Sequence, residues 1–308
     1  MSSQRQGILL AHLSDVHLPL PTVVSPFSVF NKRLLSLLSW HTKRSRDHLK
    51  ARLDQLVADL LDHEPDLIAV TGDLTNLGLD IEYRGARAWL ETLGDPARVT
   101  VIPGNHEALV RGAWDSGAAQ WRPYWQGDDD TGAAVAQAFP TLRLRGPLAL
   151  IGMSSAIPSP PGQAVGAVGP AQRTRLAEIL SDSRGKGLCR VVLIHHPPLD
   201  GTVTRRKRLR DTAEVTEILA REGVELVLHG HSHKSHHQTL QTRDGPAPVI
   251  GVPSASSMRH EAAAYNLYRV TPTGTGWEIS LTPRYLAAGG MRSGPVETLT
   301  LARAHAAK

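Results

Sequence analysis

The chain has 308 residues, of which 41% are hydrophobic and 20% charged, a composition typical of a soluble globular protein. Its single cysteine, Cys189, excludes an internal disulfide. The formal net charge of +5 and the sequence pI near 9.5 favour anionic partners, although a basic balance also serves general solubility.

The N-terminal apolar run, residues 8–13, is too short for a signal sequence or a membrane span, which predicts a cytoplasmic protein. It predicts instead a short strand over 7–14. Residues 19–47 then interrupt the chain with prolines and an apolar stretch, 27–40, that has a basic border. This stretch would either pack as a helix on the same domain or lie on a membrane surface as an amphipathic segment.

Strands and helices alternate in the following part of the chain. The spacing of apolar residues predicts a helix over 48–63, a strand over 66–71, a helix over 80–93 and a strand over 98–102. Such alternation indicates parallel βαβ units. The aromatic stretch 111–140 reads as a loop that would either form a wall for a substrate or pack on the rim.

The remaining chain continues the α/β pattern and then becomes rich in short strands. We expect strands over 142–144, 148–153, 190–194 and 224–228, helices over 171–182 and 211–222, and short strands over 238–241, 248–252, 265–271 and 276–281. The sequence therefore predicts a single α/β domain over 1–286 with a helical insertion at 19–47. The small, polar residues 287–308 predict a loosely structured tail.

Polar side chains with metal-ligand chemistry follow five of the predicted strands. They are Asp15, His17, Asp73, Asn105, His106, His195, His231 and His233. Binding sites of open α/β sheets lie at the carboxyl ends of the strands, so these groups would share one edge. Carboxylate, imidazole and amide groups together suit Mn²⁺, Fe²⁺/Fe³⁺ or Zn²⁺, and eight groups exceed the needs of one ion. The set predicts two ions that share a carboxylate.

Five ordered motifs carry a resemblance to a known family. They are Asp15-Val16-His17, Gly72-Asp73, Gly104-Asn105-His106-Glu107, His195-His196-Pro197 and Gly230-His231-Ser232-His233. In this order they resemble the calcineurin-like metallophosphoesterase superfamily, and most closely its bacterial branch that includes the class III cyclic-nucleotide phosphodiesterases. The resemblance implies a four-layer αββα sandwich with a dimetal site at the strand ends.

The resemblance also implies the role of each site residue. The first ion would be held by Asp15, His17 and His233, the second by Asn105, His195 and His231, with Asp73 as the bridge. His106 would act at the leaving-group or a phosphoryl oxygen rather than bind metal. Glu107 would orient the imidazole of His106, and His196 is the alternative to His195 as ligand.

Three functions of different classes follow. The first is a phosphodiesterase that uses a metal-activated hydroxide on small or cyclic-nucleotide diesters. The second is a membrane-peripheral hydrolase of a lipid-linked diphosphate or phosphodiester, such as UDP-diacylglucosamine, which would contact the membrane through 27–40. The third is a non-catalytic scaffold, which is disfavoured because every ligand motif is kept.

The substrate contacts are less defined than the metal ligands. A basic stretch over 205–211 lies between two site motifs, so Arg208 and Arg210, together with His196, are candidate contacts to a small-molecule phosphate ester. A solvated basic loop is the alternative. Nucleic acid is a disfavoured partner because no platform of aromatic and basic residues is evident. The β-rich C-terminal part would allow a homodimer.

Overall fold

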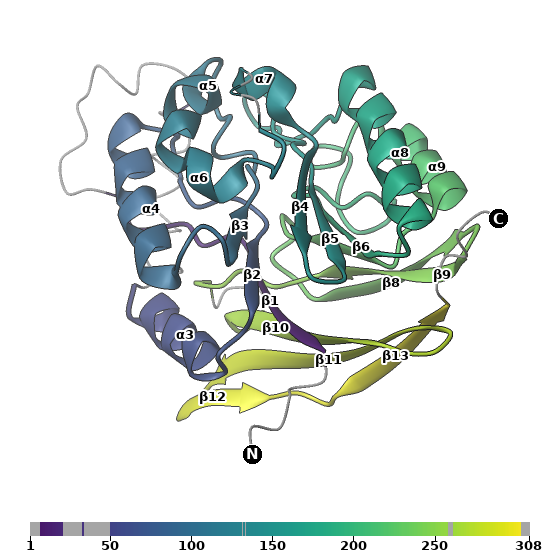
Figure 1. Ribbon diagram of the computed structural model, residues 1–308. Helices are drawn as coiled ribbons and strands as arrows, with labels where there is room; N and C mark the ends of the chain where they lie inside the picture. Colours follow the sequence, from purple (N-terminus) through teal and green to yellow (C-terminus); the bar gives the residue numbers. More distant parts are fainter. Residues whose placement is uncertain are drawn as a thin grey trace.

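Two β-sheets lie face to face with helices on both outer sides, in a computed structural model (Figure 1). One outer side carries α3 (Lys50–Asp62) and α4 (Asp80–Leu93), and the other carries α8 (Pro170–Gly185) and α9 (Thr212–Glu222). The structure describes residues 7–20, 33, 50–130, 132, 134–257 and 261–302. Within these residues the predicted four-layer αββα arrangement is confirmed.

The first sheet has the strand order β12-β11-β10-β1-β2-β3, with β13 paired to β11. Its strands are β1 (Ile8–Leu13), β2 (Leu67–Val70), β3 (Val99–Val101), β10 (Ala264–Pro272), β11 (Gly276–Ala287), β12 (Gly290–Ser293) and β13 (Glu297–Ala302). The strands β1, β2 and β3 are parallel, as the βαβ pattern predicts. Their carboxyl ends therefore meet at one edge.

The second sheet has the strand order β4-β5-β6-β7-β9-β8. Its strands are β4 (Thr141–Arg145), β5 (Leu148–Gly152), β6 (Cys189–Leu193), β7 (Leu226–His229), β8 (His236–Thr242) and β9 (Gly245–Gly251). The strands β5, β6, β7 and β9 run parallel, and β4 and β8 close the edges in the antiparallel direction. The ends of β6 and β7 carry the remaining site motifs.

Central strands are largely apolar because both of their faces are buried. In β6, Val191 and Leu193 pack in the core that also contains Leu10 of β1. Val192 faces the opposite way, into a second core with Leu176 of α8. A strand between two cores needs apolar residues at most positions, which explains the apolar runs in the sequence. Arg190 of β6 is buried as the partner of Glu225 and Asp244.

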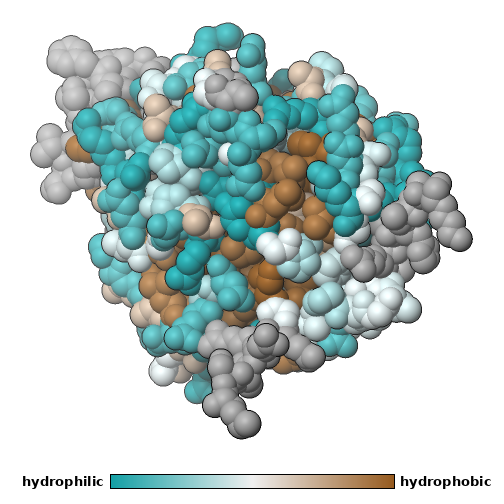
Figure 2. All heavy atoms as spheres, viewed as in Figure 1, coloured by the Kyte–Doolittle hydropathy of each residue, from teal (hydrophilic) through white to brown (hydrophobic). Residues whose placement is uncertain are grey.

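The outer faces of the second helix pair meet solvent. Seen from the side of Figure 1, hydrophilic residues cover most of the surface, α8 and α9 included, and apolar residues gather in a central band (Figure 2). Leu144 in β4 is one of the exposed large apolar side chains of the described residues.

Two predictions about the outer parts of the chain need comment. The expectation of a loose tail over 287–308 was wrong as far as residue 302, because β12 and β13 both pair with β11. Leu301 packs there against Trp277, an apolar contact that the small, polar composition conceals. The helical insertion at 19–47 and its apolar part 27–40 lie outside the described residues, except for positions 19, 20 and 33. Membrane contact therefore stays a prediction, and no helix of the described part is long and apolar enough to cross a bilayer.

The aromatic stretch 111–140 is not a loop alone. It forms the short helices α5 (Ala113–Gly117), η3 (Ala118–Trp121), α6 (Arg122–Trp125) and α7 (Val135–Ala138). Trp121 and Trp125 are fully buried, and their indole N–H groups donate to the carbonyls of Tyr83 and Ala118. These side chains pack the domain and form no wall for a substrate.

An ion-pair network ties β6 to the β8–β9 turn, and it gives a pH prediction. The buried Arg190 forms an ion pair with Asp244, and Asp244 forms a second ion pair with Arg184. Burial alone would raise the pKa of Asp244, but these two guanidinium groups hold it below its usual value. The network therefore stabilises the fold at neutral pH and loses its effect as pH falls through this lowered pKa.

We expect Asp244→Asn to lower the free energy of unfolding by about 1–3 kcal/mol at pH 7. The difference from the wild type should shrink towards pH 3, in urea unfolding curves taken at both pH values. A difference that does not depend on pH would contradict this origin.

Candidate metal centre

The predicted ligands follow five strand ends and adopt an unusual backbone conformation. Asp15, His17, Asp73, His231 and His233 all have positive φ, between 44° and 67°. For residues with a side chain, this left-handed region costs of order 1–3 kcal/mol and is typical of functional sites. The fold therefore maintains strain at these five positions.

Glycines allow the site loops to approach one another. A Cβ atom at Gly104 would lie 2.2 Å from Oδ1 of Asp73, and one at Gly230 would lie 2.5 Å from Oδ2 of Asp15. Both distances are far below van der Waals contact, so a side chain at either glycine would displace a predicted ligand.

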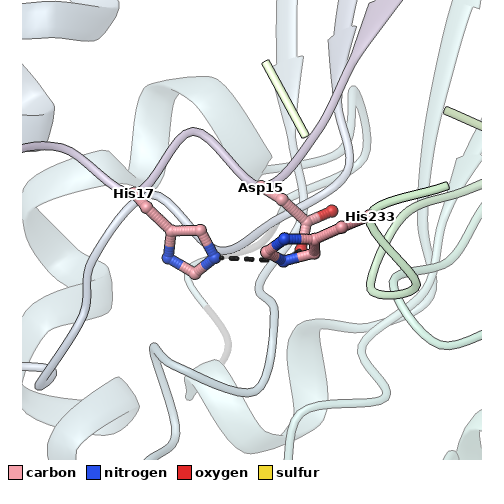
Figure 3. A group of neighbouring side chains, drawn as sticks. All are labelled: Asp15, His17 and His233. Carbon is pink, nitrogen blue, oxygen red and sulfur yellow. Dashed lines mark hydrogen bonds and ion pairs between the residues drawn. The ribbon is translucent and has the colours of Figure 1, made fainter. Parts of the chain in front are cut away.

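The first group of converging donor atoms consists of Asp15, His17 and His233 (Figure 3). The Nε2 atoms of His17 and His233 lie 3.4 Å apart, and Nε2 of His233 lies 3.1 Å from Oδ1 of Asp15. This oxygen is buried and accepts no hydrogen bond from the residues that the structure describes. Asp15 and His17 are buried, whereas 21% of the His233 side chain is exposed, so the group opens towards solvent at His233.

The second group consists of Asp73, His195 and His231, with Asn105 beside them. Nε2 of His195 lies 3.2 Å from Oδ1 of Asn105, 3.2 Å from Nδ1 of His231 and 3.4 Å from Oδ2 of Asp73. All four side chains are buried. Oδ2 of Asp73 also lies 3.9 Å from Nε2 of His17, so this carboxylate stands between the two groups.

Outer hydrogen bonds orient three of these imidazole rings. The bonds to backbone carbonyls run from Nδ1 of His17 to Thr75 (3.3 Å), from Nδ1 of His195 to Thr71 (2.7 Å) and from Nε2 of His231 to Lys207 (2.9 Å). A carbonyl can only accept, so each outer nitrogen carries a proton and the inner nitrogen is left for the site. This arrangement is typical of histidine ligands of metals.

The charges also fit a cation. Burial would raise the pKa of Asp73, yet the neighbouring His195 and His106 hold it well below its usual value. Burial would lower the pKa of His195, but the carboxylate of Asp73 raises it to about 9. The carboxylate of Asp73 therefore favours a positive charge at Nε2 of His195, which can be either a proton or a metal ion that replaces it. Asp73 lies with His195 and His231 in the second group, and with His17 and His106 in a third group of converging donor atoms. These nitrogen and oxygen donors fit two divalent ions on either side of Asp73.

His106 and Glu107 do not interact as expected. Nδ1 of His106 donates to the carbonyl of Asn76 at 2.6 Å, and its backbone N–H donates to Oδ1 of Asp73 at 2.8 Å. The prediction that Glu107 orients the His106 ring was wrong. The carboxylate of Glu107 is fully buried and accepts hydrogen bonds from backbone amides instead.

Glu107 holds the loop that follows β2. Its oxygens accept from the amides of Asp73, Leu74, Thr75 and Gly104, and from the hydroxyl of Thr75. Burial, with a contribution from the charge of Asp73, raises the pKa of Glu107 to about 7. The five donors nevertheless leave no acceptor for a carboxyl proton, so the ionised form fits this pocket.

Sequence reasoning missed a second carboxylate that acts on the same loop. Glu82 in α4 accepts from the amides of Asn76, Leu77 and Leu79. The carbonyls of this loop orient His17 and His106. Glu82 lies in the third position of α4 and accepts from the amide of the N-cap residue Leu79, which is half of a capping box. The N-cap residue is a leucine, so the sequence does not show the full motif.

His196 lies outside the groups of donor atoms. Its Nδ1 lies 2.8 Å from Oγ of Ser155, its Nε2 lies 3.2 Å from the carbonyl of Ala164, and burial lowers its pKa to about 3. Both nitrogens are therefore occupied, and the geometry favours His195 as the ligand.

We expect His195→Gln to weaken metal binding by more than the roughly 10–100-fold typical of outer partners. His196→Gln should retain the metal, since neither of its nitrogens faces the site. Titration of the metal-free variants with Mn²⁺ measures both effects. Loss of metal from the His196 variant alone would reverse the assignment.

Arg208 and Arg210 are exposed, and the structure does not bring them among the donor groups. Their loop nevertheless reaches the site through its backbone, at the carbonyl of Lys207. Their role as substrate contacts stays a prediction.

Comparison with known proteins agrees with this geometry. The profile of the calcineurin-like phosphoesterase family matches residues 8–235, a span that contains every predicted metal ligand. The chain belongs to the calcineurin-like phosphoesterase family. The family uses a dimetal centre, and the two donor groups of this phosphoesterase provide the residues for one.

Two curated proteins resemble this phosphoesterase over most of its length. A protein of Synechococcus sp., named a probable cyclic nucleotide phosphodiesterase, is 28% identical over 208 residues, which are 67% of this chain and 71% of that protein. A cAMP/cGMP dual specificity phosphodiesterase of Mycobacterium tuberculosis is 28% identical over 242 residues, which are 77% of this chain and 65% of that protein. The match thus spans just under two thirds of the second relative.

Solved structures share the fold of this phosphoesterase at low sequence identity. A dimetal phosphatase from Danio rerio is 14% identical with a TM-score of 0.58, and the match covers 96% of this chain and 99% of that one. The purple acid phosphatase PPD1 of yellow lupin is 12% identical with a TM-score of 0.56, over 97% of this chain and 54% of that one. These matches establish the fold alone.

Proposed function

We propose that this phosphoesterase is a dimetal phosphodiesterase that hydrolyses small phosphodiesters, cyclic nucleotides among them. The position of Asp73 carries the proposal, because its Oδ2 lies 3.4 Å from Nε2 of His195 and 3.9 Å from Nε2 of His17. One carboxylate can thus serve both donor groups. The names of the two curated relatives support cyclic nucleotides as the first substrates to test.

The site residues would have separate roles in such a hydrolysis. When bound, two ions supply a nucleophile from water at neutral pH and offset the charge of the phosphoryl oxygens. Asp73 and the histidines hold the ions, and the hydrogen bonds to Thr71, Thr75 and Lys207 fix the rings. His106 keeps its Nδ1 proton on the carbonyl of Asn76. In the imidazolium form its Nε2 carries a second proton, which would pass to the leaving oxygen and leave a neutral ring.

The test is hydrolysis of bis(4-nitrophenyl) phosphate and cyclic AMP by metal-stripped protein before and after addition of Mn²⁺. We expect no turnover without metal and restored turnover with it. Metal binding without cleavage of either diester would contradict the proposed function while leaving the metal site intact. Absence of metal binding would contradict the ligand assignment itself.

A further inference from the structure

A dense positive charge lies beside the metal centre. We call residues 205–210 the cationic rim, since five of these six residues are Arg205, Arg206, Lys207, Arg208 and Arg210. All five side chains are exposed. None of them forms an ion pair with a carboxylate of the described residues, although many other arginines do, Arg145, Arg184 and Arg284 among them.

Backbone contacts hold the cationic rim against the site. The carbonyl of Lys207 accepts from Nε2 of His231 at 2.9 Å, so the rim touches a predicted ligand directly. Gly166 donates to the carbonyl of Arg208 at 3.1 Å and accepts from the amide of Arg210 at 2.9 Å. Leu209 between them is buried. The main chain is thus fixed, and the charged ends project from it.

A loop that serves solubility alone does not need five cations held in a fixed main chain. Five like charges within six residues repel one another, and the fold holds them in place with a buried leucine and hydrogen bonds on both sides of Gly166. Lys234, directly after His233, adds a further exposed cation beside the other donor group. Arginine and lysine are the side chains that bind phosphate, arginine in a bidentate manner.

We propose that the cationic rim binds a second phosphate group of the substrate, so that the preferred substrate is a small phosphodiester carrying a further phosphate. The inference rests on the proposed function, because the scissile diester must occupy the metal centre. A monoanionic diester is already balanced by the ions and leaves the rim unused. A second phosphate on the same molecule would lie over the rim while the diester lies at Asp73.

A matched pair of chromogenic esters tests this inference. The 4-nitrophenyl ester of thymidine 5′-phosphate carries one phosphate, and its 3′-phosphorylated form carries a second. We expect the wild type to prefer the second ester by about tenfold or more in kcat/KM. Lys207→Gln and Arg208→Gln should each reduce this preference, and Lys207→Arg should retain it. Arg243→Gln, which removes an exposed cation at the far end of β8, is the matched control and should change nothing.

The outcomes separate the inference from the proposed function. Cleavage of both esters with equal efficiency would overturn the inference and leave the phosphodiesterase standing. Failure to cleave either ester would overturn the proposed function. Two further results would also overturn the inference. One is a Lys207→Gln variant that loses bound metal and loses activity on both esters to the same extent. The other is rim-dependent binding to phosphatidylglycerol vesicles without a preference between the esters.

Discussion

Replacement of Asp73 by asparagine should lower kcat by about 10³-fold or more, which is the largest effect of any single substitution in the centre. The amide keeps the shape of the side chain and can still accept the hydrogen bond from the amide of His106 through its oxygen. Its NH₂ group would then face His195 and His17, where the structure places Oδ2. The variant thus removes the negative charge between the two donor groups and little else.

Steady-state kinetics on bis(4-nitrophenyl) phosphate at saturating Mn²⁺ measures this loss. Asp182→Asn, an exposed carboxylate on α8, is the matched control and should retain full activity. Circular dichroism of both variants should match that of the wild type, which tests that the fold is kept. An Asp73 variant with more than a tenth of the wild-type kcat would mean that this carboxylate is not shared by two ions.

Removal of Glu107 should produce the largest loss of stability, about 3–5 kcal/mol in Glu107→Ala. Its two oxygens accept from four backbone amides and one hydroxyl, all buried. Each donor left without a partner costs of order 1–3 kcal/mol, partly recovered where water enters. The loop after β2 would lose one of the two carboxylates that hold it, and the carbonyls that orient His17 and His106 would no longer be held in place.

Urea unfolding of metal-free protein isolates this effect from the loss of metal. The m-value should stay unchanged while the midpoint falls. Glu278→Ala on β11, where the side chain is exposed, provides the control with a change within about 0.5 kcal/mol. A loss below 1 kcal/mol in the Glu107 variant would show that the loop is held by other contacts.

The central strands could be predicted from the sequence because a strand that is buried on both faces appears as a run of apolar residues. The runs that became β2, β6 and β7 are apolar at nearly every position. Turns with Gly72 and Gly230 mark where β2 and β7 end. The predicted ligands then follow from the rule that parallel strands share a carboxyl edge. The structure brings Asp15, His17 and His233 together in one donor group and Asp73, His195 and His231 in another, and the roles that the resemblance gives these residues stay predictions.

Other features depend on contacts between distant residues and left no local pattern. The backbone carbonyls of Thr71 and Lys207 orient rings that lie 124 and 24 positions away, and any residue type supplies a carbonyl. Glu107 is visible in its motif, but its binding to four amides of two loops is not. The strand β13 was missed because its apolar side, which includes Leu301, is short and becomes buried only against Trp277 of β11.

The central claim is that two ions share Asp73, and manganese titration followed by electron paramagnetic resonance tests it most directly. Metal-free protein should take up two Mn²⁺ per chain, and the filled centre should give the broadened spectrum of two coupled ions. Uptake of one Mn²⁺ per chain, with the six-line spectrum of an isolated ion, would contradict the shared centre.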